Sequence, residues 1–520
     1  MNYPEDNMCC ECNGSNVNRR RFMGVSSLAV AGAGLVGASS RAYADTTAWD
    51  PSKPMAVTGK PLRVQPVLVY DIYKRQEAVS WRPWGGLHTE DDITDEVNRI
   101  TRELYALSKQ ADFPLKILPV VRVRTIEEAN KVRDSDGYDV PIVYAAAGWT
   151  DKIEGCVSDS RNNIIFLRHK SGPVYLWYEI IHNRFLRTGG KEFELNEYRN
   201  PAGMDIHDIV VDDTGELLYK LRALYGVENF IGRRIVALGG PSGWSCPKAP
   251  EISRGKFKLD IKTVDYKELE GMIKAARMDS RRVGAAERDA ERYLSLPETT
   301  LDTDRQFVVN AFILFGLFKE LMAANDADVF TIRGCMGTVI PMSETTACLP
   351  LSLLNDEGYP AFCESDFNVI PSGILLHYIS GKPVFLNDPT YPHKGMVTCA
   401  HCTAPRRMDG KTYARTKVLT HYESDYGAAP KVELPPGTDV TMICPDSPQK
   451  EWLGFTGTID DSPFYDICRS QYDISIHGNW KKLLSDHRGF HWMMACGDYT
   501  REMEYACPKV GVSWVNVSEA

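Results

Sequence analysis

The sequence lacks internal repeats and low-complexity tracts, and no long run of lysine and arginine follows its first 44 residues. Its composition carries none of the signs of a disordered or collagen-like chain. The 60 basic and 69 acidic side chains give a formal net charge of -9 at pH 7. Because phosphate binding usually requires a clustered basic face, we expect no nucleic-acid partner.

Long apolar runs are also missing after residue 44. A helix that crosses a bilayer needs about 20 predominantly apolar residues. We therefore expect no later segment to be long and apolar enough, and no permanent membrane span.

The first 44 residues have the character of a targeting segment. Consecutive arginines in N-R-R-R-F-M-G, residues 18–24, precede a short, mildly apolar run at 25–40, and A-Y-A at 42–44 supplies small residues for cleavage. A permanent membrane anchor is the alternative, but it needs a longer and more apolar run. The segment resembles a bacterial twin-arginine leader. That resemblance implies recognition by the Tat export machinery, cleavage after Ala44 and a periplasmic or extracellular mature protein.

The cysteines do not have the spacing of a disulfide framework. Three of the 14 lie in the leader, so an odd number remains and at least one thiol cannot pair within the chain. Cys399 and Cys402 form a C-x-x-C motif, which raises a redox or zinc function. A four-ligand zinc site normally shows a second such pair, and a reactive thiolate is favoured at a helix start, whereas this motif lies on a strand-like run. We expect most cysteines, including Cys348 and Cys363, to be small core residues.

The length of 520 residues predicts about three domains. Strand-like runs at residues 64–70 and 140–145 alternate with helical patterns, which predicts βαβ units and a parallel sheet. A second such unit begins near Gly232. Its first strand runs into a glycine turn in R-I-V-A-L-G-G-P, residues 234–241, which can be a plain turn or can approach a phosphate group. A helix is expected at residues 305–324.

We therefore predict an α/β protein in four segments. They are the leader at residues 1–44, an N-terminal α/β domain at 45–230, a second α/β domain at 231–403, and a smaller β-rich domain at 404–520. Short strand-like runs separated by glycine and proline indicate the last of these.

Two carboxylates, Glu344 and Asp366, stand at the ends of the stretch E-T-T-A-C-L-P-L-S-L-L-N-D-E-G-Y-P-A-F-C-E-S-D. We expect Glu344 to open a helix at residues 345–355 and Asp366 to follow a strand at 359–363. In a doubly wound sheet, the start of a crossover helix and the end of the next strand lie at the same edge, where ligands bind. The two side chains should therefore converge.

Two acids at such an edge can bind a divalent cation or transfer protons. With an added histidine nitrogen they would suit Mn²⁺, Zn²⁺ or Fe²⁺. Alternatively, Glu344 satisfies free N–H groups at a helix start and Asp366 caps the next helix. The pattern leaves both uses open. The acids of the turn between them, Asp356 and Glu357, are expected to be solvated.

Five sequence pieces carry a family resemblance: C-L-P-L-S-L-L-N-D-E-G at 348–358, C-E-S-D at 363–366, S-G-K-P-V-F-L-N-D at 380–388, H-C-T-A-P at 401–405 and H-x5-G-D at 491–498. In this order and spacing, the chain resembles the superfamily of L-fucose isomerase and L-arabinose isomerase, particularly its shorter, divergent sugar isomerase-like members.

This resemblance implies two Rossmann-like domains followed by a β-barrel-like domain, and a Mn²⁺ site built from a glutamate, an aspartate and a late histidine. By motif position these are Glu344, Asp366 and His491. In the family, the cation holds oxygens of an open-chain sugar, and proton transfer through a cis-enediolate interconverts aldose and ketose. Glu344 and Asp366 would then also be the catalytic proton-transfer groups. Members are usually homo-oligomers.

Three further residues are weighed against bland alternatives. His401, near the junction with the last domain, can bind substrate or be a satisfied core histidine. Glu364 can bind substrate or contact a metal ligand from outside the first set of ligands. His377, in an apolar helix, is expected to be structural.

The sequence thus predicts an exported, metal-dependent aldose–ketose isomerase that acts on a monosaccharide such as a deoxyhexose or pentose. Two alternatives stay open. One is a non-catalytic sugar-binding or sensing protein on the same scaffold, and the other is a sugar epimerase, which shares the enediolate.

Overall fold

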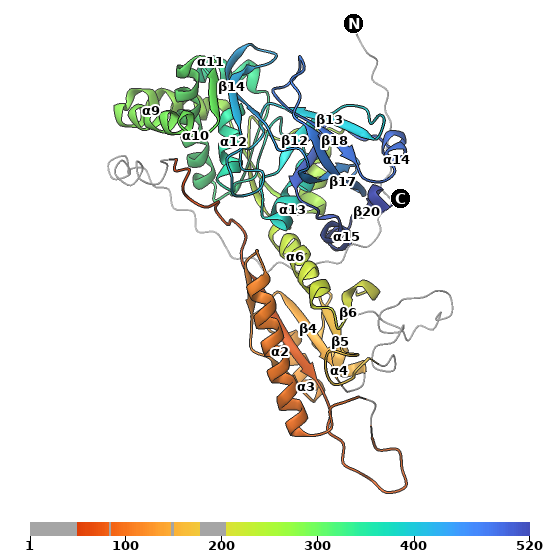
Figure 1. The fold of residues 1–520 in the computed structure, drawn as a ribbon. Coiled ribbons are helices and arrows are strands. Elements are labelled where there is room, and N and C mark those ends of the chain that lie inside the picture. Colours follow the sequence, from red (N-terminus) through yellow and green to blue (C-terminus); the bar gives the residue numbers. More distant parts are fainter. Residues whose placement is uncertain (1–48, 83–84, 147–149, 177–203, 520) are drawn as a thin grey trace.

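The computed structural model describes residues 49–82, 85–146, 150–176 and 204–519. The predicted leader at residues 1–44 lies outside these residues. Figure 1 shows two lobes, with the N-terminal α/β domain in orange below and the rest of the chain above. Helix α6 (Thr214–Phe230) runs from one lobe to the other. The predicted fold class is confirmed: two parallel-sheet α/β units are followed by a smaller antiparallel barrel.

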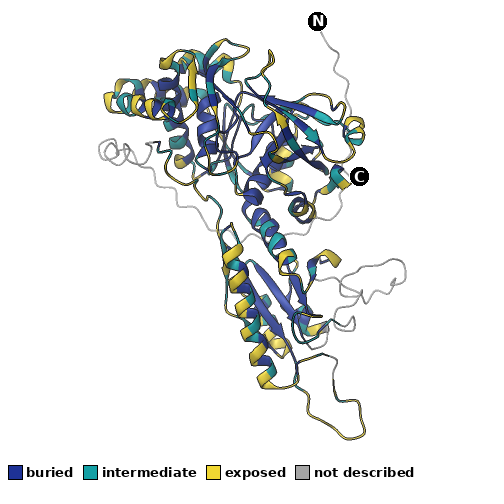
Figure 2. Ribbon diagram, viewed as in Figure 1, coloured by how far each residue is buried: buried dark blue, intermediate teal, exposed yellow. Residues whose placement is uncertain are grey.

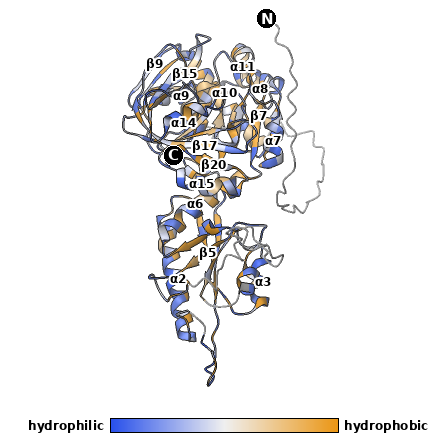
Figure 3. Ribbon diagram, turned by 90° about the vertical axis from the view of Figure 1, so that its right-hand side faces the viewer, coloured by the Kyte–Doolittle hydropathy of each residue, from blue (hydrophilic) through white to orange (hydrophobic). Residues whose placement is uncertain are grey.

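The N-terminal domain is built on one parallel sheet. Its elements before α6 are β1 (Leu62–Val69), α2 (Glu90–Gln110), β2 (Leu115–Ile117), β3 (Val121–Val123), α3 (Ile126–Arg133), β4 (Val140–Ala145), α4 (Thr150–Cys156), β5 (Ile164–Leu167), the 3₁₀ turn η2 (Ile206–Asp208) and β6 (Ile209–Val211). The strand order is β2-β1-β4-β5-β6, with β3 also paired to β1. Figure 3 shows α2 and α3 on either side of the hydrophobic strands. Because helices cover both faces, β1 and β4 can be buried along almost their whole length.

The second domain carries a smaller parallel sheet of order β11-β10-β7-β8. Its elements are β7 (Arg234–Leu238), α7 (Ala249–Lys256), β8 (Asp260–Val264), α8 (Tyr266–Met278), α9 (Ser280–Leu294), β9 (Thr299–Asp302), α10 (Arg305–Ala324), β10 (Val329–Ile332), α11 (Cys335–Ser343), α12 (Cys348–Asp356), β11 (Ala361–Phe362) and α13 (Ile370–Ser380). The carboxyl ends of β7, β10 and β11 meet at one edge, because all pairings in this sheet are parallel.

The remaining elements are β12 (Phe385–Pro389), β13 (Met396–His401), β14 (Thr416–His421), β15 (Tyr426–Val432), β16 (Asp439–Pro445), β17 (Glu451–Asp461), β18 (Ser470–Ile476), α14 (Trp480–Ser485), β19 (Trp492–Cys496), α15 (Thr500–Lys509), β20 (Ser513–Asn516) and the 3₁₀ turn η3 (Val517–Glu519). Six strands close a ring in the order β16-β19-β12-β13-β18-β17, with β17 pairing back to β16. Every pairing around this ring is antiparallel. Closure removes the unpaired sheet edges that an open sheet would expose.

The barrel begins earlier than the predicted boundary at residue 404. β12 and β13 belong to the ring, although they precede that residue. Conversely, β14 and β15 lie after it but form a separate small sheet with β9 of the second domain. Strand pairing between distant segments decides both assignments, and composition along the chain carries no signal of it.

Helix α10 is long and apolar enough to cross a membrane by length and composition alone. The expectation that no later segment has this property is therefore wrong for α10. Its apolar side chains pack in the core of the second domain, among them Phe315 and Phe318, and Figure 2 shows the helix largely buried. A helix that is hydrophobic all round can be a core helix or a membrane span. The absence of a permanent membrane span stays a prediction.

Residues 49–58, interpreted from sequence as part of a linker, are docked on the second domain. The Trp49 ring is buried in that domain's core beside Tyr293 and Phe312, and its backbone N–H donates to Asp289 at 3.1 Å. The Ala56 N–H donates to the Glu357 carbonyl at 2.7 Å. The chain therefore crosses the second domain before it enters the N-terminal domain.

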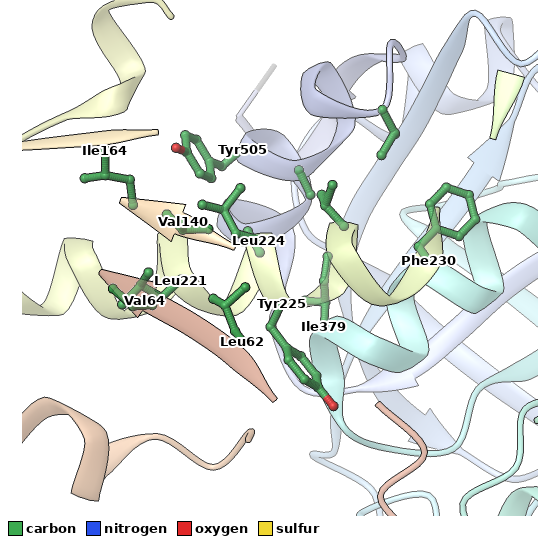
Figure 4. Close-up of a cluster of buried hydrophobic side chains, with 14 of the residues drawn as sticks. Leu62, Val64, Val140, Ile164, Leu221, Leu224, Tyr225, Phe230, Ile379 and Tyr505 are labelled. Carbon is green, nitrogen blue, oxygen red and sulfur yellow. The ribbon is translucent and has the colours of Figure 1, made fainter. Parts of the chain in front are cut away.

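Helix α6 joins the cores of the two lobes. Figure 4 shows Leu221 and Leu224 of α6 against side chains of the N-terminal sheet, and Tyr225 beside Ile379 of α13. All of these residues belong to one continuous hydrophobic cluster. The N-terminal domain is thus fixed to the remainder of the protein by apolar packing as well as by the chain connection.

His377 is a structural histidine, as expected. It is buried in α13, where its Nδ1 lies 2.9 Å from the Lys382 carbonyl oxygen and donates to it as neutral imidazole. Burial lowers the pKa of His377 to about 4 from its ordinary 6.5, although the hydrogen bond to Lys382 opposes that shift. The folded protein therefore keeps this ring neutral at pH values where the unfolded chain protonates it.

We expect His377 to make the protein less stable in mild acid. Because its folded pKa lies below its unfolded pKa, the unfolded state takes up a proton first, and stability falls as the pH drops below about 6.5. Between pH 7.5 and pH 5 the loss is about 2 kcal/mol of unfolding free energy. Urea titrations at both pH values, on the wild type and on His377→Gln, measure it. If the variant shows the same pH dependence as the wild type, this assignment is wrong.

Candidate metal centre

Four side chains with metal-binding atoms meet where the second sheet faces the rim of the barrel. Glu364 follows β11, Asp388 lies in β12, His401 ends β13 and His491 immediately precedes β19. The strand register explains the convergence, because Asn387 of β12 pairs with Trp492 of β19, and Asp388 pairs with Ala400 of β13. Asp388 is therefore set between His491 on one neighbouring strand and His401 on the other.

Glu364 reaches this point from a strained turn. Glu364 and Ser365 both adopt left-handed backbone conformations, with φ of 64° and 49°. Such a conformation costs roughly 1–2 kcal/mol for each residue with a side chain. Ser242 holds the turn, since its N–H donates to the Ser365 carbonyl at 3.0 Å and its carbonyl accepts from Phe367 N–H at 2.9 Å. Strain of this kind is concentrated at functional sites.

The donor atoms are close enough to share one ion. His491 Nε2 lies 3.4 Å from Glu364 Oε2 and 3.3 Å from Asp388 Oδ1. His401 Nε2 lies 3.6 Å from Glu364 Oε1. Four ligands at about 2.1 Å around a tetrahedral ion are about 3.4 Å apart. The spacing of these atoms fits that arrangement.

The second nitrogen of each imidazole is held from outside the cluster. His491 Nδ1 lies 2.7 Å from Asp366 Oδ2, and this carboxylate is buried. The other Asp366 oxygen accepts from Asn368 N–H at 3.0 Å and from its side-chain amide at 2.8 Å. His401 Nδ1 lies 3.1 Å from Thr403 Oγ1. Metal-binding histidines typically have their second nitrogen fixed in this way, which orients the ring.

The charges of the cluster support one another. Burial alone would lower the pKa of both histidines, but hydrogen bonds and charges from the carboxylates outweigh it. The pKa of His401 is raised, and that of His491 is raised to about 10, chiefly by Asp366 and Glu364. Burial acts to raise the pKa of Glu364, yet the two histidines hold it well below its usual range. Burial raises the pKa of Asp388, against the pull of both histidines.

The donor set fits a divalent cation of intermediate hardness. Two imidazole nitrogens and two carboxylates suit Mn²⁺, Fe²⁺ or Zn²⁺ better than the soft ions that prefer thiolates. Asp388, His401 and His491 offer atoms that all lie within 4.8 Å of one another, and so do Cys363, Glu364 and His401. A cation bound here would balance the carboxylate charge that the two imidazoles balance in the structure.

Four of the residues singled out from sequence meet at this site, and one does not. Asp366, His491, His401 and Glu364 come together, with Glu364 and Asp388 facing the histidines from the positions expected of ligands and Asp366 one bond further out. Glu344 lies elsewhere, with a side chain that is 58% exposed and paired to Arg277 of α8 at 3.0 Å.

The position of Glu344 follows from a helix that the sequence pattern does not reveal. Glu344 is the residue that ends α11, in a left-handed conformation, instead of opening the next helix, which begins at Cys348. α11 starts directly after β10 at the carboxyl edge of the sheet and has nine residues. Its far end is therefore about 13 Å along the helix from that edge.

A second expectation for the same stretch is wrong. Asp356 is fully buried, and its Oδ1 accepts from the Arg407 N–H at 2.7 Å. Burial raises the pKa of Asp356 to about 7. Asp356 belongs to the last turn of α12, which packs against the chain on both sides, so the apparent turn is an interior position. Glu357 pairs with Lys319 at 2.6 Å and keeps some exposure.

Sequence reasoning missed Asp388 and two aromatic side chains. Asp388 lies within a motif recognised from sequence, so its position gave a signal that was not used. Trp244 follows the glycine turn after β7; its ring centroid is 6.2 Å from that of His491 and 6.1 Å from that of Phe490. Trp244 and Phe490 are 58% and 61% exposed. They form an apolar edge beside the histidine.

Replacing Asp366 with asparagine should weaken metal binding without removing a ligand. The amide cannot accept the His491 Nδ1–H bond as strongly, so the imidazole loses its fixed orientation. Outer partners of this type typically contribute 10–100-fold in metal affinity. Titration of Asp366→Asn with Mn²⁺, followed by calorimetry, should show about that loss. An unchanged affinity would contradict the assigned role of Asp366.

Comparisons with known proteins leave the chain without an assigned family. No protein-family model matches the sequence, and no curated protein does. Among solved structures, one similarity is to a LacI family transcription regulator from Clostridium acetobutylicum, at 11% sequence identity and a TM-score of 0.15, covering 52% of this chain and 79% of that one.

Proposed function

We propose that the protein is a metal-dependent aldose–ketose isomerase acting on a free monosaccharide. The observation that carries the proposal is the convergence of Glu364, Asp388, His401 and His491, with both imidazoles fixed from behind. Mn²⁺ is the proposed cation, and the same donors would accept Fe²⁺ or Zn²⁺. This ligand set replaces the one expected from sequence, in which Glu344 and Asp366 are direct ligands.

The proposed chemistry needs an acidic C–H next to a carbonyl and a carboxylate to move its proton. When bound, the cation would polarise the sugar carbonyl and so acidify the neighbouring C–H. Asp388 is the best placed proton carrier, because its side chain is 45% exposed, against 33% for Glu364 and 3% for Asp366. Asp366 positions His491 and does not reach the substrate.

The surroundings of the cluster also suit a sugar. Trp244 and Phe490 offer exposed apolar surface beside His491, against which the C–H face of a pyranose or an open chain can pack. The polar atoms of the cluster lie on the other side of the histidine ring. One apolar wall and a few convergent polar groups are the usual composition of a small-ligand site.

Deuterium exchange on a panel of aldoses and ketoses tests this proposal directly. The protein is loaded with Mn²⁺, its metal content is measured, and each sugar is followed by NMR in D₂O. An isomerase converts aldose to ketose with exchange at the carbon next to the carbonyl, whereas an epimerase exchanges the proton and inverts that carbon. A sensing protein binds sugar without exchange. Lack of both stoichiometric metal and turnover on every sugar overturns the proposal.

The other expectations stay predictions alongside this one. They are export through the Tat machinery to the periplasm or beyond, the absence of a nucleic-acid partner, and homo-oligomeric assembly. Size-exclusion chromatography with light scattering would measure the last of these.

A further inference from the structure

Three thiols from distant parts of the chain form a small cluster next to His401. Cys402 is buried and touches Cys348, at the start of α12, while Cys468 packs against the same group from the segment before β18. The Cys402 thiol is in hydrogen-bonding contact with the thiols of both neighbours. All cysteines among the described residues are free thiols. The cluster is therefore a place where a disulfide can form without large movements of the chain.

The cluster also resolves the C-x-x-C motif. Cys399 lies on β13 and packs in the barrel core, with Val397 and Trp492. Cys402 lies just beyond the end of the same strand and belongs to the other cluster. Side chains three residues apart on a strand point to opposite faces. Cys399 is therefore not the partner of Cys402, and the motif gives no redox pair of the usual kind.

The backbone brings Cys402 and Cys468 together at the paired ends of two strands. β13 and β18 are antiparallel neighbours, and their last pair in this direction is His401 with Ser470. Just beyond it, the Arg469 N–H donates to Cys402 Sγ at 3.4 Å. Cys468 is the next residue along. Cα atoms near such a register lie in the range of a few ångströms that a disulfide spans.

We propose that Cys402 and Cys468 form a reversible disulfide in the presence of a small-molecule disulfide. The Cys468 thiolate attacks one sulfur of the small disulfide, forming a mixed disulfide and releasing one thiolate. The Cys402 thiolate then attacks Cys468 Sγ, forming the Cys402–Cys468 bond and releasing the second thiolate. Two protein thiols are oxidised, one small disulfide is reduced to two thiols, and the two protons pass to the released thiolates.

Exposure selects Cys468 over Cys348 as the first thiol to react. Cys348 and Cys402 are buried, whereas Cys468 is partly exposed, beside a loop whose Phe464, Tyr465 and Ile467 face solvent. An external disulfide must reach the first thiol, but the second attack is internal and needs no access. Because Cys402 directly follows His401, the bond would tie the metal-cluster end of β13 to β18.

Oxidation of the full chain by oxidised glutathione tests the proposal. The protein is first reduced, then incubated with the small disulfide, blocked with N-ethylmaleimide and digested without reductant. Peptide mapping should find one new cross-linked peptide that joins Cys402 and Cys468, with the other described cysteines still labelled. Adding excess dithiothreitol should restore two free thiols.

Three single variants make the result decisive. Cys468→Ser should abolish the cross-link, whereas Cys348→Ser and Cys246→Ser should leave it unchanged, since Cys246 lies outside the cluster and keeps comparable partial exposure. A cross-link between Cys348 and Cys402 overturns the pairing. Glutathione retained at Cys468 with no internal bond overturns the second step, and full labelling of all three thiols overturns the site itself.

Discussion

Glu364→Gln is expected to reduce Mn²⁺ affinity by more than about 100-fold, because it removes a proposed ligand, and outer partners alone contribute 10–100-fold. The Glu364 carboxylate is the group that faces both His401 Nε2 and His491 Nε2. A neutral amide of the same shape would keep the packing but lose the negative charge that balances a cation. Turnover of any sugar substrate should fall with the metal, and excess Mn²⁺ should restore part of it.

Glu344→Gln supplies the matched control. It makes the same chemical change at a glutamate that lies outside the cluster, paired to Arg277 on the surface. Exposed ion pairs contribute about 0–1 kcal/mol to stability, so folding and metal affinity should be close to those of the wild type. Calorimetric titration of both variants with Mn²⁺ compares the two positions. Equal losses at both positions, or a loss only in Glu344→Gln, would show that the ligand set inferred from the structure is wrong.

Arg168→Met is expected to destabilise the N-terminal domain by about 3–5 kcal/mol, the usual loss when one partner of a buried ion pair is removed. Arg168 follows β5 and is fully buried; its Nε lies 2.6 Å from Glu96 Oε1, and its Nη2 lies 2.6 Å from Glu103 Oε2. Glu96 is also fully buried and accepts from Tyr175 at 2.6 Å. Without the guanidinium, Glu96 keeps only Arg99 as a charged partner, at 3.1 Å.

Chemical unfolding, combined with hydrogen exchange of peptides from β1 and β4, measures this loss in the correct domain. Arg133→Met is the matched control, since Arg133 pairs with Asp134 on the surface and should change stability by less than about 1 kcal/mol. The double variant Glu96→Leu with Arg168→Met should regain much of the loss, because no buried charge is then left unpaired. A loss as large in Arg133→Met would mean that burial is not the cause.

Much of the architecture could be predicted from local pattern. Apolar residues in continuous runs predict the buried strands, and α10 has the predicted bounds of residues 305–324. The helix pattern near residue 93 also predicts α2, although the capping box of Thr89 and Asp92 sets its start three residues earlier, at Glu90. Such local signals work because propensity, capping and periodicity act within a few turns of chain.

The site could be predicted only in part. The motif pieces led to Asp366, Glu364, His401 and His491, which the fold does bring together. They did not reveal that Asp366 orients His491 while Glu364 faces the cluster, because those two carboxylates are two residues apart and only the strained turn after β11 decides which way each points. They also misplaced Glu344, since α11 is short, contains a proline and has weak periodicity.

The sequence by itself determined the fold class, the alternation of strands and helices, and the residue types available for metal chemistry, because each of these is written in local composition and spacing. Only the tertiary structure decided which of those residues share a site. Asp388 and the two histidines meet through the register of three antiparallel strands, and Glu364 joins them from another domain. Distances of this kind depend on pairings between segments far apart in the chain, for which local sequence carries no energy term.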